Sequence, residues 1–288
     1  MSNVIGLDLG TNSIGWALRN PNRDGNQIEK FGVLTFKKGV GIDKTGEYSY
    51  AAERTKKRSV RRLYQARKYR LWDTLRHLIQ LGYCPLTIEA LNKWRHYDKQ
   101  EAIKNSNGGR VYPVEDHAFD AWIKLDFNGD GKPDYTSPYQ LRKELATVQL
   151  DMDVEMDRAK LGRALYHIAQ RRGFKSSRKS GEDLKDGRSE DSDMIDLQVS
   201  EKKKNRRIDE EFQKYPEAKT IGHLFALLED NNERVRERIA QFAIRENYKD
   251  EIRFIFENQG LGVTNKLYEL LVESGRNKND GSIFYKIS

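Results

Sequence analysis

One acidic side chain near the start of the chain has the setting of a metal ligand. Asp8 lies in the apolar run VIGLDL, residues 4–9. An unpaired carboxylate is costly among apolar strand residues, and a metal ion would supply the missing positive charge. The Gly-Thr-Asn-Ser turn at 10–13 carries backbone N–H groups able to approach a phosphate. The alternative is a strand-end aspartate that caps its own turn. The residues alone support these two interpretations equally.

A second group of chemically active residues is a dense cluster of cations. Residues 54–70 contain nine lysines and arginines, and the one acid beside them is Glu53. Cations packed this closely repel one another unless a polyanion neutralises them, and the forked guanidinium suits phosphate. The sequence therefore favours nucleic-acid binding over the alternative of a solvated basic face. Helical spacings of three and four place four arginines on one broad face, with a fifth further along: Arg54, Arg58, Arg61 and Arg62, then Arg67.

The element that must position these arginines is a long helix. Residues 51–81 contain no Gly and no Pro, which predicts a helix of roughly 46 Å. Leu71, Leu75 and Leu78 form an apolar stripe that anchors its second half in protein, and Gly82 ends it. Before it, residues 4–18 predict a hairpin and residues 27–36 a third strand.

A further basic group closes a second predicted helix, within residues 161–179 (LGRALYHIAQRRGFKSSRK). Its cations are Arg171, Arg172, Lys175 and Arg178. A helix that ends in this way can present cations to phosphate. Cations at a helix C-terminus are also ordinary dipole and capping chemistry, so both interpretations stay open.

The loop from Asp126 to Asp134 (DFNGDGKPD) places oxygen ligands at alternate positions, as calcium loops do. An EF-hand loop also needs a bidentate Glu at its twelfth position, where this chain has Ser137. We therefore prefer a tight polar turn to a calcium site.

The overall composition bounds the remaining possibilities. The formal net charge of +8 over 288 residues suggests a polyanionic partner. The single cysteine, Cys84, allows no internal disulfide and suits a reducing cytoplasm. It also makes a structural zinc site an unfavoured interpretation. No signal peptide and no transmembrane segment are expected, hence no membrane partner.

The first motif resembles two families that share a ribonuclease-H-like architecture. IGLDLGTNS resembles the first phosphate loop of the actin, sugar-kinase and heat-shock ATPase superfamily. IGLDLGTNSIGWAL resembles the first RuvC segment of the type II CRISPR RNA-guided endonucleases. The arginine helix that follows resembles the bridge helix of the second family. The segments HIAQRRGF, SPYQLR and IRENYKDEIRFIFENQ (residues 244–259) resemble pieces of its recognition lobe.

The resemblance implies an α+β fold that is incomplete relative to the family. Residues 1–50 would be the first RuvC-like segment, with three strands of a ribonuclease-H-like sheet. Residues 51–84 would be the bridge helix, and residues 85–288 part of a mainly helical recognition lobe with a flexible loop at about 180–207. The second and third RuvC segments and the HNH nuclease of the family have no counterpart in this sequence.

The resemblance also implies a function, which is antiviral cleavage of DNA directed by a guide RNA and dependent on Mg²⁺, or alternatively Mn²⁺. Asp8 would be a catalytic metal ligand, and the two basic clusters would contact RNA. For this chain alone the expectation is RNA binding without cleavage, because no motif marks a partner acid for Asp8. The expected partners are guide RNA, target DNA and the rest of the same nuclease, in the bacterial cytoplasm and at the nucleoid during targeting. The alternatives are an ATPase or kinase fragment and a non-catalytic RNA-binding module.

Overall fold

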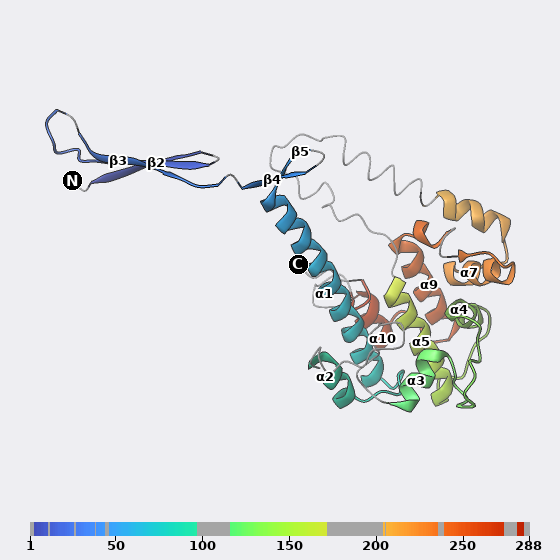
Figure 1. The fold of residues 1–288 in the computed structure, drawn as a ribbon. Coiled ribbons are helices and arrows are strands. Elements are labelled where there is room, and N and C mark those ends of the chain that lie inside the picture. The colour runs from blue at the N-terminus through green and yellow to red at the C-terminus, as the bar shows by residue number, and fades with distance from the viewer. Residues whose placement is uncertain are drawn as a thin grey trace. The chain divides into compact units, whose positions relative to one another are not determined.

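The computed structural model describes residues 3–10, 12–25, 27–37, 39–43, 46–96, 116–171, 204, 206–235, 239–273 and 281–284. The chain divides into two compact units, residues 1–65 and 66–288. Strands occur in the first and helices dominate the second, so the α+β class expected from the sequence is confirmed (Figure 1).

The first unit is built on a three-stranded antiparallel sheet in the order β1-β2-β3. Strand β1 (Val4–Leu9) pairs with β2 (Ser13–Arg19), which pairs with β3 (Ile28–Thr35). The predicted hairpin and third strand are therefore confirmed. The turn between β1 and β2 is closed by a hydrogen bond from Gly10 N to Ser13 O at 2.9 Å, so this N–H is already used.

Both faces of this sheet are apolar and exposed. Side chains alternate between the faces of a strand, and the register places Ile5, Leu7 and Leu9 on the same face as Trp16. The opposite face carries Phe31, which is 80% exposed. A sheet with two apolar faces is typical of a central layer covered on both sides.

A second, two-stranded ladder follows, which the sequence reasoning missed. Strands β4 (Val40–Asp43) and β5 (Gly46–Ser49) pair antiparallel just before the long helix. Gly41 lies against the Tyr48 ring, since a Cβ at Gly41 would come within 2.5 Å of that ring. The chain therefore does not pass directly from the three-stranded sheet into the helix.

The long helix α1 spans Tyr50–Gln80 and confirms the helix predicted for residues 51–81. It begins in the first unit and ends in the second. Gly82 adopts a left-handed backbone, φ +77°, and the Tyr83 N–H donates to Leu78 O at 2.8 Å. This is the expected glycine stop signal.

The second unit is helical and surrounds one apolar core that runs from Leu75 to Phe284. Helix α4 (Pro138–Thr147) contacts α5 (Glu155–Arg171), α7 (Ile221–Asp230) and α9 (Arg245–Asn258), and α3 (His117–Lys124) also packs on α5. Ser137 caps α4 through its hydroxyl and Pro138 follows it, which is a common start signal for a helix. The helical elements are α2 (Ile88–His96), α3 (His117–Lys124), α4 (Pro138–Thr147), α5 (Glu155–Arg171), α7 (Ile221–Asp230), the 3₁₀ turn η2 (Ala240–Phe242), α9 (Arg245–Asn258), α10 (Lys266–Tyr268) and the π-helical turn η3 (Glu269–Glu273).

Most of the loop expected at residues 180–207 lies outside the described residues. Where the structure describes its end, residues 204 and 206–207 are helical, and the helix continues to residue 214. A helix therefore begins within the last residues of that range, and the buried Ile208 gives it an apolar anchor. Among the described residues, no helix is long and apolar enough to cross a membrane.

Candidate nucleic-acid interface

The arginine face of α1 consists of Arg54, Arg58, Arg61 and Arg62, and all four side chains are exposed. Within the part of the chain that the structure describes, none of the four forms an ion pair. The Lys57–Glu53 pair on the same helix, Nζ to Oε1 at 2.6 Å, neutralises the acid of this segment. Arg67 is exposed as well. The four guanidinium groups thus form a concentrated positive surface that is available to phosphate.

The second half of α1 packs into the core of the second unit. Leu75 and Leu78 are fully buried, and Trp72 Nε1 donates to Leu91 O at 3.3 Å. Arg70 belongs to this packed half and not to the exposed cluster, because it is only 4% exposed.

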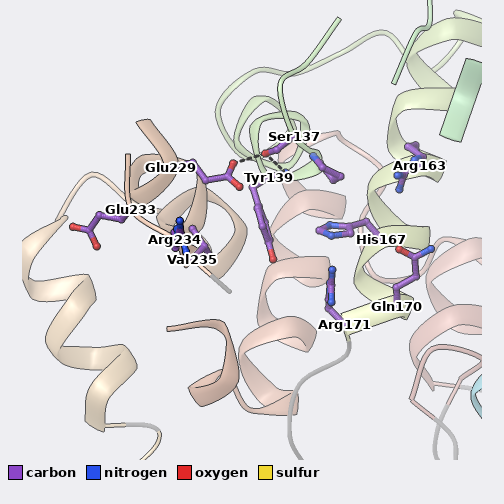
Figure 2. Close-up of a pocket in the computed structure, with 11 residues that line it drawn as sticks. Ser137, Tyr139, Arg163, His167, Gln170, Arg171, Glu229, Glu233, Arg234 and Val235 are labelled. Atoms are coloured by element: carbon purple, nitrogen blue, oxygen red, sulfur yellow. Dashed lines mark hydrogen bonds between the residues drawn. The ribbon is translucent and has the colours of Figure 1, made fainter. Parts of the chain in front are cut away.

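The second basic cluster is described only in part. Helix α5 ends at Arg171, which is partly exposed, while Arg172, Lys175 and Arg178 lie outside the described residues. Arg171 lines a pocket of about 460 Å³ between the start of α4, the end of α5 and residues 229–235 (Figure 2).

The segments that resemble the recognition lobe meet in the core of the second unit. Arg142 of SPYQLR and Glu251 of α9 form an ion pair, Nε to Oε1 at 2.8 Å, with both side chains 0% exposed. His167 of HIAQRRGF lies 3.5 Å away, from its Nδ1 to Arg142 Nη1. Burial alone would lower the pKa of Arg142, but the Glu251 carboxylate outweighs it and the net shift is upward. These motif residues therefore hold helices together.

Other positions of the same motifs are equally internal. Tyr139 and Tyr248 place their rings 5.2 and 5.5 Å from the Arg142 guanidinium. Gln259 donates to Leu145 O at 2.8 Å, which ties the end of α9 to α4. A Cβ at Gly222 of α7 would lie 2.1 Å from Glu251 Oε1, so only glycine allows α7 to pass over the ion pair.

Asp8 has a different environment from the one that the sequence suggests. It is exposed on β1, and its partner in the register is Gly15 of β2. The premise that burial makes this carboxylate costly is therefore wrong for the described chain, because the sheet face around it is open. Among the described residues, no group of three or more His, Cys, Asp or Glu side chains is placed to hold a metal ion. Its role as a metal ligand stays a prediction.

The loop at 126–134 is closed by its own hydrogen bonds. Asp126 accepts from Gly129 N at 2.8 Å and from Gly131 N at 3.0 Å, and Asp134 accepts from Phe127 N at 2.6 Å. These contacts fit the tight polar turn preferred from the sequence.

Comparison with known proteins finds no matching family model but many similar solved structures. One structure is Cas9 of Corynebacterium diphtheriae in complex with sgRNA and target DNA. It is 20% identical, with a TM-score of 0.44, and the match covers 93% of this chain and 27% of that one. Another is the St1Cas9–sgRNA–tDNA59–ntPAM complex, at 18% identity and a TM-score of 0.43, covering 96% of this chain and 26% of that one. Both are Cas9 complexes. This chain spans about a quarter of the length of either.

One feature of α1 was not found by sequence reasoning. Val60, Leu63 and Tyr64 lie away from the arginine face and are exposed by 44%, 63% and 66%. Their spacing of three and four is the signal that would have found them. The first half of α1 therefore exposes three apolar side chains in addition to its cations.

Proposed function

We propose that this chain is the N-terminal part of a type II CRISPR RNA-guided DNA endonuclease, and that by itself it binds RNA without cleaving DNA. The observation that carries the proposal is the exposed arginine face of α1 on a helix anchored in a core. In this proposal Arg54, Arg58, Arg61 and Arg62 bind the phosphates of the guide. Arg67, Arg171, Arg172, Lys175 and Arg178 add further contacts. Base pairing then supplies the sequence specificity, while the protein reads backbone and shape.

The proposed domain layout follows from the order of the motifs. Residues 1–50 form the first RuvC-like segment of a ribonuclease-H-like domain, residues 51–84 the bridge helix and residues 85–288 part of the recognition lobe. The order of sheet, arginine helix and helical unit supports this layout. The working location is the bacterial cytoplasm, and the nucleoid during targeting.

In the complete nuclease, Asp8 would be one ligand of the Mg²⁺ ions that activate water and stabilise the leaving oxygen. Such a site needs several carboxylates. Asp8 is the one residue that the motifs mark, and it does not make a complete site. We therefore assign no cleavage step to this chain.

The exposed apolar faces of the β1–β3 sheet support a protein partner for the first unit. Phe31, Leu9 and Val33 are exposed by 80%, 73% and 68%. A sheet of this kind is stabilised when further layers remove these side chains from water. We propose that the rest of the same nuclease supplies those layers, and that target DNA joins the assembly through paired guide RNA.

The proposal is tested by binding of the purified chain to structured RNA, duplex DNA and ATP over a series of salt concentrations. We expect tight RNA binding that weakens steeply with salt and no ATP binding. ATP binding without RNA preference would support the ATPase alternative. Guide-directed DNA nicking with Mg²⁺, lost in Asp8→Ala, would contradict the absence of cleavage. If the chain binds RNA but does not restore cleavage when it is combined with the rest of a nuclease, the result would indicate the non-catalytic module.

A further inference from the structure

The pocket at the end of α5 offers hydrogen-bonding groups of both charge signs. Its lining includes Arg171 and Gln170 of α5, Glu229 of α7, Arg234 and the ring of Tyr139. Its volume of about 460 Å³ falls in the range of small-molecule sites, roughly 300–1,000 Å³. The pocket belongs to the second unit alone, whose core fixes the helices around it.

The acidic side of the pocket is held in place by α4. The Ser137 hydroxyl donates to Glu229 Oε2, and Ser137 Oγ in turn accepts from Tyr139 N at 3.1 Å. Figure 2 shows the Glu229 carboxylate turned toward Ser137, while the Glu233 carboxylate points away from the other labelled side chains. Within the described residues, Glu229 Oε1 accepts no hydrogen bond, so it is open to a donor on a ligand.

The basic side of the pocket includes Arg171. Among the described residues its guanidinium makes no hydrogen bond and no ion pair, and its Nε is buried. A pocket for phosphate alone would not keep a carboxylate in its wall, because the two anions would repel each other. The ligand should therefore carry donors for Glu229 and acceptors for arginine on one small, flat body.

We propose that this pocket binds the base of one unstacked guanine nucleotide in the bound RNA, with Glu229 and Arg171 as its specificity-determining residues. Guanine N1–H and N2–H are adjacent donors for the Glu229 carboxylate, and O6 and N7 are adjacent acceptors for a guanidinium. Single-stranded RNA presents such edges, and an aromatic ring such as that of Tyr139 suits a flat base. This inference rests on the proposed RNA-binding function.

The test measures equilibrium binding of GMP, IMP, 7-deaza-GMP, AMP and CMP to the full chain, with RNA binding measured in parallel. IMP lacks the N2 amino group and 7-deaza-GMP lacks N7, so each removes one contact without changing the protein. We expect GMP to bind roughly tenfold or more tightly than IMP, AMP or CMP, and 7-deaza-GMP to bind several-fold more weakly than GMP. Glu229→Gln should lose the preference for GMP over IMP, while the matched control Glu257→Gln, an exposed acid outside the pocket, keeps it.

The outcomes separate this proposal from the one on which it rests. Substitution of the four α1 arginines should abolish most RNA binding and leave the preference for GMP intact. RNA binding with equal affinity for all the nucleotides would overturn the guanine pocket alone. If the chain prefers GMP but does not bind RNA, the base does not come from RNA. That result would also overturn the proposed function. Unchanged far-ultraviolet circular dichroism of Glu229→Gln shows that the variant is folded.

Discussion

The arginines of α1 and the arginine of α4 occupy opposite environments. Arg54, Arg58, Arg61 and Arg62 are exposed and lack ion-pair partners within the described residues. Arg142 is fully buried between two tyrosine rings and paired with Glu251. The sequence motifs around both groups resemble one nucleic-acid-binding family. The structure indicates that only the first group has the exposure that phosphate binding needs, whereas the second joins helices.

The difference lies in how each charge is compensated. A buried guanidinium is tolerated only with a partner, and Glu251 supplies it inside the chain. The exposed guanidinium groups of α1 are hydrated and repel one another. A bound polyanion relieves that repulsion, and the release of the polyanion's counterions further favours binding. An arginine in a motif is therefore not by itself a contact to RNA, and its exposure and internal partners must be known first.

The largest expected effect comes from breaking the internal pair. Arg142→Met should lower the free energy of unfolding by about 3–5 kcal/mol, because it leaves the Glu251 carboxylate buried without a partner. The matched control is the next residue, Lys143, whose pair with Asp230 at 2.9 Å is partly exposed. Lys143→Met should cost at most about 1 kcal/mol. Denaturant unfolding measures both, and equal losses would show that Arg142 is not a structural arginine.

The next effect concerns the exposed group and should leave stability unchanged. Replacing Arg54, Arg58, Arg61 and Arg62 by Gln should weaken RNA binding on the order of a hundredfold at physiological salt. It should also reduce the slope of log K against log salt by about 3, since each phosphate contact contributes about 0.7–0.9. A control with the same loss of charge replaces four cations of the second unit, of which the first is partly exposed and the others are exposed: Lys143, Arg206, Lys214 and Lys266. Equal weakening in both variants would indicate a general charge effect and no α1 interface.

The sequence predicted the elements that depend on local patterns. Helix α1 follows from a stretch without Gly or Pro. The three strands follow from apolar runs and a turn. These signals are contained in a few consecutive residues, so no tertiary information is needed to read them.

The site could be predicted only in part, because its environment depends on distant residues. Arg142 and Glu251 are 109 positions apart, and nothing local marks either as the partner of the other. The burial of Arg70 and the exposure of Asp8 depend likewise on what packs around them. Apolar neighbours along β1 suggested a buried carboxylate, but neighbours in sequence do not cover the face on which Asp8 lies.

A third prediction compares two aspartates that the sequence treats as similar metal-ligand candidates. Asp126 is 9% exposed and accepts two backbone hydrogen bonds, whereas Asp8 is exposed. Asp126→Ala should lower the free energy of unfolding by about 1–3 kcal/mol, because it leaves loop N–H groups without their acceptor. Asp8→Ala should leave it unchanged within error. Calorimetry or denaturant unfolding distinguishes the two, and a clear loss in Asp8→Ala would indicate that its sheet face is covered in the isolated chain.

The smallest expected effect is a pH dependence that arises from the packed half of α1. Burial lowers the pKa of His77, and the charges of Arg76 and Lys266 lower it further against the opposing effect of Asp73. Because the unfolded chain then binds the proton more readily, this histidine destabilises the fold as the pH falls below its ordinary value of about 6.5. The loss levels off once the pH passes the lowered pKa. His77→Gln should flatten the profile of the free energy of unfolding against pH in that window, because the variant has no imidazole to bind the proton. If His77→Gln kept the same slope as the unmodified chain, the titrating group would lie elsewhere, and the packed half of α1 would be more open to water than its buried leucines indicate.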